Sequence, residues 1–291
     1  MTATPRNCTV TGAPSVVFFP FRDTVYVSVE RIITQTPLKH SLANLKTNKA
    51  PGPDGITAEL LQEGGDTLHE WLFVLITSIF ETRIIPTQLE TSEIITLFKK
   101  NDPLNCANYR PISLLNHVYK LVMQIIYSRI KQDLIAVLPN NQAAYQPGRG
   151  TVEQIQIIQQ IIEKAHKYQS PCVICFVDYT KAFDSVDQAK LWEVLSDYTW
   201  IDSAYINLLA KLYENSTTRV RTHLGNTDII YLRKGVKQGD FPSAVFFCVI
   251  LLVILLYVFE YLDFGFSLGG QTFSDVDYAC LLYTSPSPRD S

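Results

Sequence analysis

The chain has 291 residues, a formal net charge of −3 at pH 7, 47% hydrophobic residues and 18% charged residues. This length predicts one large domain or two subdomains, and the hydrophobic content excludes a globally disordered chain. Because the net charge is slightly negative, the chain has no general attraction to nucleic acid. Any such contact needs a local basic patch.

Cysteine usage and apolar runs favour an intracellular protein, cytoplasmic or nuclear. The one C-x-x-C pair, Cys172 and Cys175, is weak evidence for zinc, and we expect reduced thiols. No basic segment followed by a long apolar core opens the chain, so we expect no signal peptide. The longest uncharged apolar run covers 16 residues, 244–259. A membrane span needs about 17–25 residues, so the run predicts a buried core helix, with a membrane-associated fragment as the alternative.

Apolar spacing predicts a largely helical first half of the chain. Residues 1–37 show no strong period and form an irregular lead-in. Leucine, isoleucine and valine then recur at helical spacing, with a Ser113 cap before the fourth helix. The predicted elements are helices over 38–46, 57–62 and 66–83, a strand over 93–98, an extended segment over 108–113, and helices over 114–130 and 151–168.

The second half alternates strands and helices. A β-branched apolar run over 172–177 predicts a buried central strand, and Asp184 is the natural cap of the helix that follows. A helix over 205–213 precedes a hairpin with arms at 218–223 and 229–233. The apolar helix comes next. This order predicts an α/β or α+β fold rather than a helical bundle.

Asp178 stands at the end of the predicted central strand. Asp favours neither strands nor burial, so this carboxylate is placed to hold a divalent cation together with substrate phosphates. The turn over 179–183 would present backbone N–H groups to an anion. A surface aspartate that caps the next helix explains the sequence equally well, and both interpretations stay open.

Two basic segments interrupt the acidic chain. Residues 83–133 hold seven Lys or Arg against four Asp or Glu, including Lys99, Lys100 and Arg110, and residues 211–237 hold six against two. Local balances of +3 and +4 fit phosphate or nucleic-acid contact, although solvated helix faces are the simpler explanation for each lysine. Gln238-Gly239 is a weaker signal: a glycine beside an amide lets a base or sugar approach the backbone.

Five blocks, taken together, resemble the reverse transcriptases of non-LTR (LINE-type) retrotransposons. The resemblance covers about residues 38–279 and keeps the order of that family's motifs. The blocks are Lys49-Ala50-Pro51-Gly52-Pro53-Asp54-Gly55-Ile56; Phe98-Lys99-Lys100 with Asn108-Tyr109-Arg110-Pro111-Ile112-Ser113-Leu114-Leu115; Asn141-Gln142-Ala143-Ala144-Tyr145-Gln146-Pro147-Gly148-Arg149-Gly150-Thr151; Phe176-Val177-Asp178-Tyr179-Thr180-Lys181-Ala182-Phe183-Asp184-Ser185-Val186-Asp187; and Gly235-Val236-Lys237-Gln238-Gly239-Asp240.

The resemblance implies a right-hand polymerase with fingers and palm, the palm a small antiparallel sheet backed by helices. It also implies an RNA template, a DNA primer, deoxynucleoside triphosphates and two Mg²⁺ ions. Asp178 would be a metal ligand beside the Tyr179 carbonyl, and the Phe183 ring would exclude a ribose 2′-hydroxyl. The remaining nucleotide-binding residues would be Lys99, Lys100, Arg110, Lys181, Ala182, Gln238 and Gly239.

The chain departs from the family where two further catalytic aspartates are expected. The family's turn is aromatic-Ala-Asp-Asp, and here the sequence reads Tyr278-Ala279-Cys280-Leu281. We therefore expect a chain cut within this motif, with fingers and the start of the palm over 38–170, palm over 171–279 and a non-native tail over 280–291. The resemblance implies an RNA-directed DNA polymerase domain, and this departure from the family implies that it is a poor catalyst. The alternative is a non-catalytic nucleic-acid-binding remnant.

Overall fold

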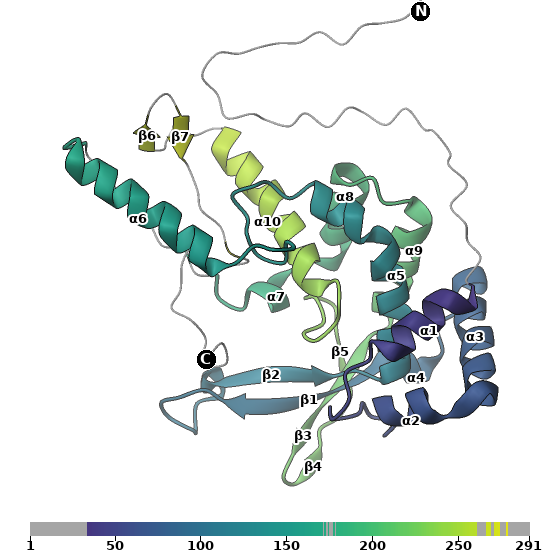
Figure 1. The fold of residues 1–291 in the computed structure, drawn as a ribbon. Helices are drawn as coiled ribbons and strands as arrows, with labels where there is room; N and C mark the ends of the chain where they lie inside the picture. The colour runs from purple at the N-terminus through teal and green to yellow at the C-terminus, as the bar shows by residue number, and fades with distance from the viewer. Residues whose placement is uncertain are drawn as a thin grey trace, which may run out of the picture.

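A computed structural model describes residues 34–170, 172, 174, 177, 179–260, 266–268, 271–273 and 278. Most helices gather into one body, the helix labelled α6 extends away from it, and a sheet runs along one side (Figure 1). This arrangement confirms the predicted α/β class. The division into lead-in, fingers, palm and tail stays a prediction.

Four helices build the first part of the described chain: α1 (Gln35–Ala43), α2 (Ala58–Glu63), α3 (Gly65–Thr82) and α4 (Thr87–Glu90). Leu38 and Leu42 lie one turn apart on α1 and are buried against the core. The Thr57 side chain caps α2 by accepting a hydrogen bond from the Leu60 amide at 3.3 Å. The short α4 was not predicted, because four residues are too few to show a helical period.

The sheet joins segments that are far apart in the sequence. It contains β1 (Thr91–Phe98), β2 (Tyr109–Leu114), β3 (Thr217–Thr222), β4 (Gly225–Asn226) and β5 (Ile230–Tyr231). The order is β2-β1-β3-β4, and β5 also pairs with β3. Because β1 is antiparallel to β2 but parallel to β3, the sheet is mixed rather than wholly antiparallel. The predicted hairpin arms are confirmed.

The register of this sheet places basic side chains from both basic segments on one face. Leu97 lies opposite Arg110 across β1 and β2, and Glu93 lies opposite Arg219 across β1 and β3. Positions 93 and 97 point to the same side of β1, and so do 219 and 221 on β3. Arg221 forms an ion pair with Glu93, which is only 5% exposed. We call Arg110, Arg219 and Arg221 the arginine face.

The main core lies between α5 (His117–Ala136), α8 (Gln188–Tyr198), α9 (Ser203–Glu214) and α10 (Ser243–Glu260). Ile126, Leu209 and Phe246 are fully buried there. Each such side chain contributes about 1.5–3 kcal/mol when it leaves water. The remaining described elements are the long helix α6 (Thr151–Lys167), the single turn α7 (Ala182–Ser185), a 3-10 helix at Cys106–Asn108, and the strand pair β6 (Phe266–Leu268) and β7 (Gln271–Phe273).

Helix α10 is the core helix predicted from the apolar run. Val245–Val249 are all buried, and the helix packs against α5, α7 and α8. Ile254, Tyr257 and Val258, near its end, are exposed. Within the part of the chain that the structure describes, no helix has both the length and the apolar character needed to cross a membrane.

Both predicted helix caps are wrong. Ser113 lies inside β2, and the residue before α5 is Asn116. The helix after Asp184 is interrupted, because α7 ends at Ser185 and α8 begins only at Gln188. The cap of α8 is Asp187, whose carboxylate accepts a hydrogen bond from the Lys190 amide at 3.1 Å. An aspartate three residues further along thus has the geometry that the N-cap position requires.

The predicted buried strand over 172–177 is not formed by its described residues. Cys172, Ile174 and Val177 belong to no strand, and Ile174 and Val177 are 39% and 37% exposed. A strand needs a neighbour for its backbone hydrogen bonds, and no described strand pairs with these residues. The remaining residues of the run lie outside the described part.

The glycine-rich loop before α2 packs tightly on the start of α5. A Cβ atom added to Gly52 would lie 2.6 Å from the Asn116 amide nitrogen and 2.8 Å from its Cα. Just beyond the loop, the His117 Nδ1 atom lies 2.9 Å from the Ile56 carbonyl oxygen. The first sequence block of the resemblance is therefore in direct contact with Asn116 and His117, which follow the second block, and this contact depends on glycine.

We predict that Gly52→Ala lowers the free energy of unfolding by about 1–3 kcal/mol, because the new methyl group meets backbone atoms that cannot turn aside. Urea unfolding followed by circular dichroism measures the change. Gly150→Ser is the control, since a Cβ there meets nothing within 4 Å and serine is a favoured N-cap for α6. Equal stability of the Gly52→Ala variant and the unaltered chain would contradict the close packing.

Candidate functional site

The loop Gly235–Asp240 lies directly against the turn Lys181–Asp184, which follows the predicted metal-binding position. The Val236 amide donates to the Phe183 carbonyl at 2.9 Å, and the Gly235 amide donates to the Val186 carbonyl at 2.7 Å. Two of the blocks identified in the sequence, about 50 residues apart, therefore share backbone hydrogen bonds.

Gly235 permits this contact. Its φ angle is +88°, and a Cβ atom there would lie 3.0 Å from the Asp184 Cα and 3.1 Å from the Phe183 carbonyl oxygen. A side chain would be strained both by the left-handed backbone and by the neighbouring main chain. The Gln188 side chain closes the junction by donating to the Gly235 carbonyl at 3.1 Å.

Residues 237–240 form a tight turn with Gln238 and Gly239 at its tip. The Asp240 amide donates to the Lys237 carbonyl at 3.2 Å, and Gly239 has a φ angle of +100°. A left-handed glycine at the third position is typical of a type II turn. At the tip, the Gln238 side chain donates to the Asp184 carboxylate at 3.1 Å. A Cβ on Gly239 would lie 3.5 Å from the Ser113 carbonyl oxygen of β2.

The two corner residues of this turn point into the core. Lys237 is 7% exposed and Asp240 is 8% exposed. The Lys237 ammonium donates to the Leu212 carbonyl at 3.2 Å and lies 4.2 Å and 5.0 Å from the ring centres of Tyr119 and Tyr213. The Asp240 carboxylate accepts hydrogen bonds from the hydroxyl groups of the same two tyrosines at 3.2 Å and 3.5 Å.

Burial shifts the pKa of every ionisable group in this cluster. Desolvation raises the pKa of Asp240 to about 6, against the opposing effect of Lys237. Desolvation lowers the pKa of Lys237 to about 8, although Asp240 favours its charged form. The pKa of Tyr119 and that of Tyr213 are raised, first by burial and then by the nearby Asp240 charge. Both tyrosines therefore remain neutral hydrogen-bond donors.

The turn before the loop holds four predicted nucleotide-binding residues. Lys181 is exposed, with a left-handed φ of +51°, Ala182 is buried and Tyr179 is half-buried. The Phe183 ring stacks on Phe247 of α10, with ring centres 5.2 Å apart and planes at 15°. This stacking fixes the ring that the resemblance places under the deoxyribose.

The structure does not bring all predicted residues together. Arg110 is exposed on β2, three residues before Ser113, and its side chain points to the opposite face of the strand from that of Ser113. Lys99 and Lys100 are exposed beyond the end of β1, where the Lys99 amide donates to the Asn108 carbonyl at 2.8 Å. The lysines therefore lie further along the β1–β2 hairpin than the Gln238-Gly239 tip.

The predicted metal ligand Asp178 lies outside the described residues. Among those that the structure does describe, no group of three or more His, Cys, Asp or Glu side chains could hold a metal ion. The nearest described carboxylate of the loop junction, Asp184, already accepts a hydrogen bond from Gln238. The described donor set therefore does not by itself fit a magnesium site.

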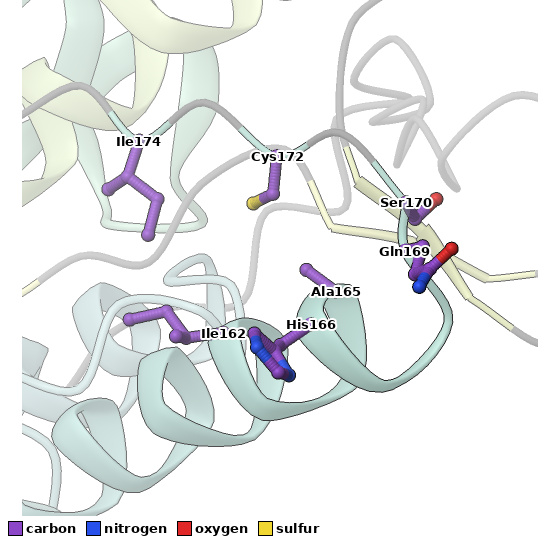
Figure 2. A pocket seen from close by; sticks show the side chains of 7 residues that line it. All are labelled: Ile162, Ala165, His166, Gln169, Ser170, Cys172 and Ile174. Carbon is purple, nitrogen blue, oxygen red and sulfur yellow. The ribbon is translucent and has the colours of Figure 1, made fainter.

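A cavity of about 520 Å³ lies beside α6 (Figure 2). In Figure 2, Cys172 and Ile174 point from the following segment toward the helix. Its other lining residues are Ile162, Ala165, His166, Gln169 and Ser170. The lining includes no residue of the Gly235–Asp240 loop, so the cavity is separate from the candidate site.

Sequence reasoning missed the buried cluster around the turn. Tyr119 and Tyr213 sit among helical apolar residues, and nothing in their spacing shows that they share a partner. From their residue types alone, Lys237 and Asp240 would be expected to be solvent-exposed charges of a surface loop. Their signal was weak but present, since two opposite charges three residues apart flank a glycine-containing pair in a short segment before an apolar helix.

We predict a pH-dependent stability difference between the unaltered chain and Asp240→Asn. Because folding raises the pKa of Asp240 from 3.8 to about 6, its contribution to stability is full below pH 3.8 and is lost as the pH rises through 6. The advantage of aspartate over asparagine should thus fall by up to about 3 kcal/mol between pH 4 and pH 7. Urea unfolding across this range measures it, and a constant difference would contradict burial of the carboxylate.

Comparison with known proteins agrees with the motif order. Residues 98–261 match the reverse transcriptase (RNA-dependent DNA polymerase) family. The "Transposon TX1 uncharacterized 149 kDa protein" of Xenopus laevis is 29% identical over 72% of the chain and 16% of its own length. The "Retrovirus-related Pol polyprotein from type-2 retrotransposable element R2DM" of Drosophila melanogaster is 23% identical over 77% of the chain and 21% of its own length.

The "RNA-directed DNA polymerase from mobile element jockey" of Drosophila funebris is 25% identical over 72% of the chain and 23% of its own length. The chain thus spans about a fifth of the length of these curated relatives. The family match covers more than half of the chain, and it agrees with the resemblance to non-LTR retrotransposon enzymes. The chain therefore belongs to the reverse transcriptase (RNA-dependent DNA polymerase) family.

Proposed function

We propose that this chain provides the fingers and part of the palm of an RNA-directed DNA polymerase that copies RNA into DNA for retrotransposition, in the cytoplasm or nucleus. The observation that carries this proposal is the junction at Gly235, where the Gly235–Asp240 loop is hydrogen-bonded to the Lys181–Asp184 turn. That junction places Phe183 and the Gln238-Gly239 tip beside each other. An incoming deoxynucleotide and its template base need such a pair of surfaces.

In this proposal the junction selects a deoxynucleotide by shape. Phe183 cannot turn aside, because its ring is stacked on Phe247 within the core. A ribose 2′-hydroxyl would meet this ring, whereas a deoxyribose would pack on it. Gly239 lacks a side chain and has an exposed backbone, so a base can approach the turn closely. The resemblance assigns the triphosphate to Arg110 and either Lys99 or Lys100, which in this structure lie on the β1–β2 hairpin rather than at the tip.

The arginine face is the proposed contact for the RNA template. Arg110, Arg219 and Arg221 are exposed and come from two strands on either side of β1. One buried acid, Glu93, is paired with Arg221 and leaves the face with a positive balance. Tyr231 of β5 lies opposite Thr217, on this same side, and is 66% exposed. An exposed aromatic ring among arginines suits single-stranded nucleic acid.

Enzymes of this family transfer nucleotides in a metal-dependent reaction, and we propose Mg²⁺ as the ion, with Asp178 and the Tyr179 carbonyl as ligands. Cys280 and Leu281 stand where the family's pattern has two aspartates. Neither a thiol nor an isobutyl group replaces a carboxylate as a ligand for Mg²⁺. The chain is therefore proposed to bind template and nucleotide but to polymerise poorly.

A non-catalytic nucleic-acid-binding remnant is the second candidate. It is favoured by the same exposed arginines, which need no metal site to bind phosphates. The two candidates differ at Asp178. RNA binding with no response to Mg²⁺ and deoxynucleotides would favour the remnant.

We predict that the chain incorporates little or no deoxynucleotide on a primed RNA template with Mg²⁺, and that the double substitution Cys280→Asp/Leu281→Asp raises incorporation. The restored carboxylates would supply the missing ligands. Gel-based primer extension measures this. The control adds Asp178→Ala to the double substitution and should remove the gain. Robust extension by the unaltered chain, abolished in Asp178→Ala, would overturn the expected weak activity.

We predict that Arg219→Ala weakens binding of a single-stranded RNA about three- to tenfold and lowers the slope of log affinity against log salt by about one, because one phosphate contact is lost. Fluorescence anisotropy at several salt concentrations measures both quantities. Lys164→Ala, an exposed position on α6, is the matched control and should leave the slope unchanged. An unchanged slope in Arg219→Ala would place the RNA elsewhere.

A further inference from the structure

In the turn Lys237–Asp240, the charged side chains are buried and the uncharged residues at the tip are more exposed, which is unusual. Its corners, Lys237 and Asp240, are 7% and 8% exposed, whereas Gly239 at its tip is exposed and Gln238 is half-buried. Charged residues usually point to solvent, and small or amide residues are found on either side. Here the charges point inward and the contact residues outward.

The inward corners are held by separate elements of the core. Lys237 donates to a carbonyl near the end of α9, and its ammonium lies over Tyr119 of α5 and Tyr213 of α9. Asp240 accepts from both tyrosine hydroxyls and from the Phe241 amide at 2.9 Å. Tyr213 also contacts the Ser243 hydroxyl at 3.2 Å, at the start of α10. Helices α5, α9 and α10 thus hold the turn in place from its buried side.

The outward tip has few contacts of its own. Gln238 donates to Asp184, and a Cβ atom added to Gly239 would meet only the Ser113 carbonyl oxygen, at 3.5 Å. The hydrogen bond of Gln238 is exposed and restrains the backbone of the tip only weakly, and Gly239 has no side chain to add to it. The position of the tip therefore depends on its corners.

We propose that Lys237 and Asp240 are positioning residues, which use their buried charges and two shared tyrosines to hold the Gln238-Gly239 tip in the shape that receives the nucleotide. The part about the nucleotide rests on the proposed function. The part about the tip does not, because it concerns the free protein. Neither charged group touches the nucleotide in this proposal.

The test compares Lys237→Met, Asp240→Asn and the double variant, which remove the charges with little change in volume. Hydrogen exchange followed by mass spectrometry reports on the amides of Gly235, Val236 and Asp240, whose hydrogen bonds hold the loop. We expect exchange in the peptide over 235–242 to become about tenfold faster in each single variant, with β1, β2 and α9 unchanged. Lys234→Met, an exposed lysine next to the loop, is the control.

A second measurement separates positioning from general stability. In the double variant no charge is left unpaired, so the thermal midpoint should recover toward that of the unaltered chain. The Kd for a deoxynucleoside triphosphate on primed RNA with Mg²⁺ should nevertheless stay raised, with the Kd for the RNA unchanged. Recovery of both the midpoint and the nucleotide affinity would reduce the pair to a structural role and overturn the proposal.

Two further outcomes are decisive. If single substitutions do not fold, Tyr213→Phe removes only a hydroxyl from the cluster, and it should still quicken exchange in the 235–242 peptide. Unchanged exchange in that variant overturns the proposal. If the unaltered chain binds no nucleotide, the proposed function fails, but faster local exchange in the variants still supports control of the tip by its corners.

Discussion

Burial of two opposite charges at the base of one turn is the constraint on which this structure depends. Moving an isolated charge out of water costs several kcal/mol, so Lys237 and Asp240 require polar partners inside the core. The partners come from α5 and α9, and the turn leads directly into α10. The packing of these three helices and the conformation of the loop therefore depend on the same buried contacts.

Local pattern was sufficient for most of the helices and strands. Apolar residues recur at helical spacing in α3, α5 and α9, and the hairpin arms carry β-branched residues around Gly225-Asn226. The parallel pairing of β1 with β3 could not be predicted in this way. It joins residues about 125 positions apart, and no local property of either strand specifies its partner.

The errors have particular physical causes. Three polar residues near the start of α8, Asp184, Ser185 and Asp187, could each cap a helix, and only backbone geometry selects Asp187. The run over 172–177 has the composition of a buried strand, but its described residues, Cys172, Ile174 and Val177, belong to no strand, because composition alone does not supply a neighbour for the backbone. Buried charges are the hardest case, because Lys237 and Asp240 have the residue types of a surface loop.

The residues proposed to contact substrate were therefore predictable from the sequence, but the residues that hold them in position were not. Motif order identified Phe183, Gln238 and Gly239, and the structure places them around one junction. The residues that hold the junction in shape, Gly235 and the buried pair, act through backbone approach and desolvation. Neither effect has a sequence signature at one position.

The two surfaces proposed for substrate contact, the arginine face and the Gln238-Gly239 tip, differ in how far the charges that govern them are exposed to solvent. The arginine face is in solvent, so the attraction for RNA proposed for it would be screened within about 8 Å at physiological salt. Lys237 and Asp240 are buried, and the forces that shape the tip are screened much less. In the proposed polymerase, the contacts with the template would be weak and salt-sensitive, whereas the proposed nucleotide pocket would keep its shape. The separation follows from where the charges lie, because the same pair of side chains on the surface would contribute no more than about 1 kcal/mol.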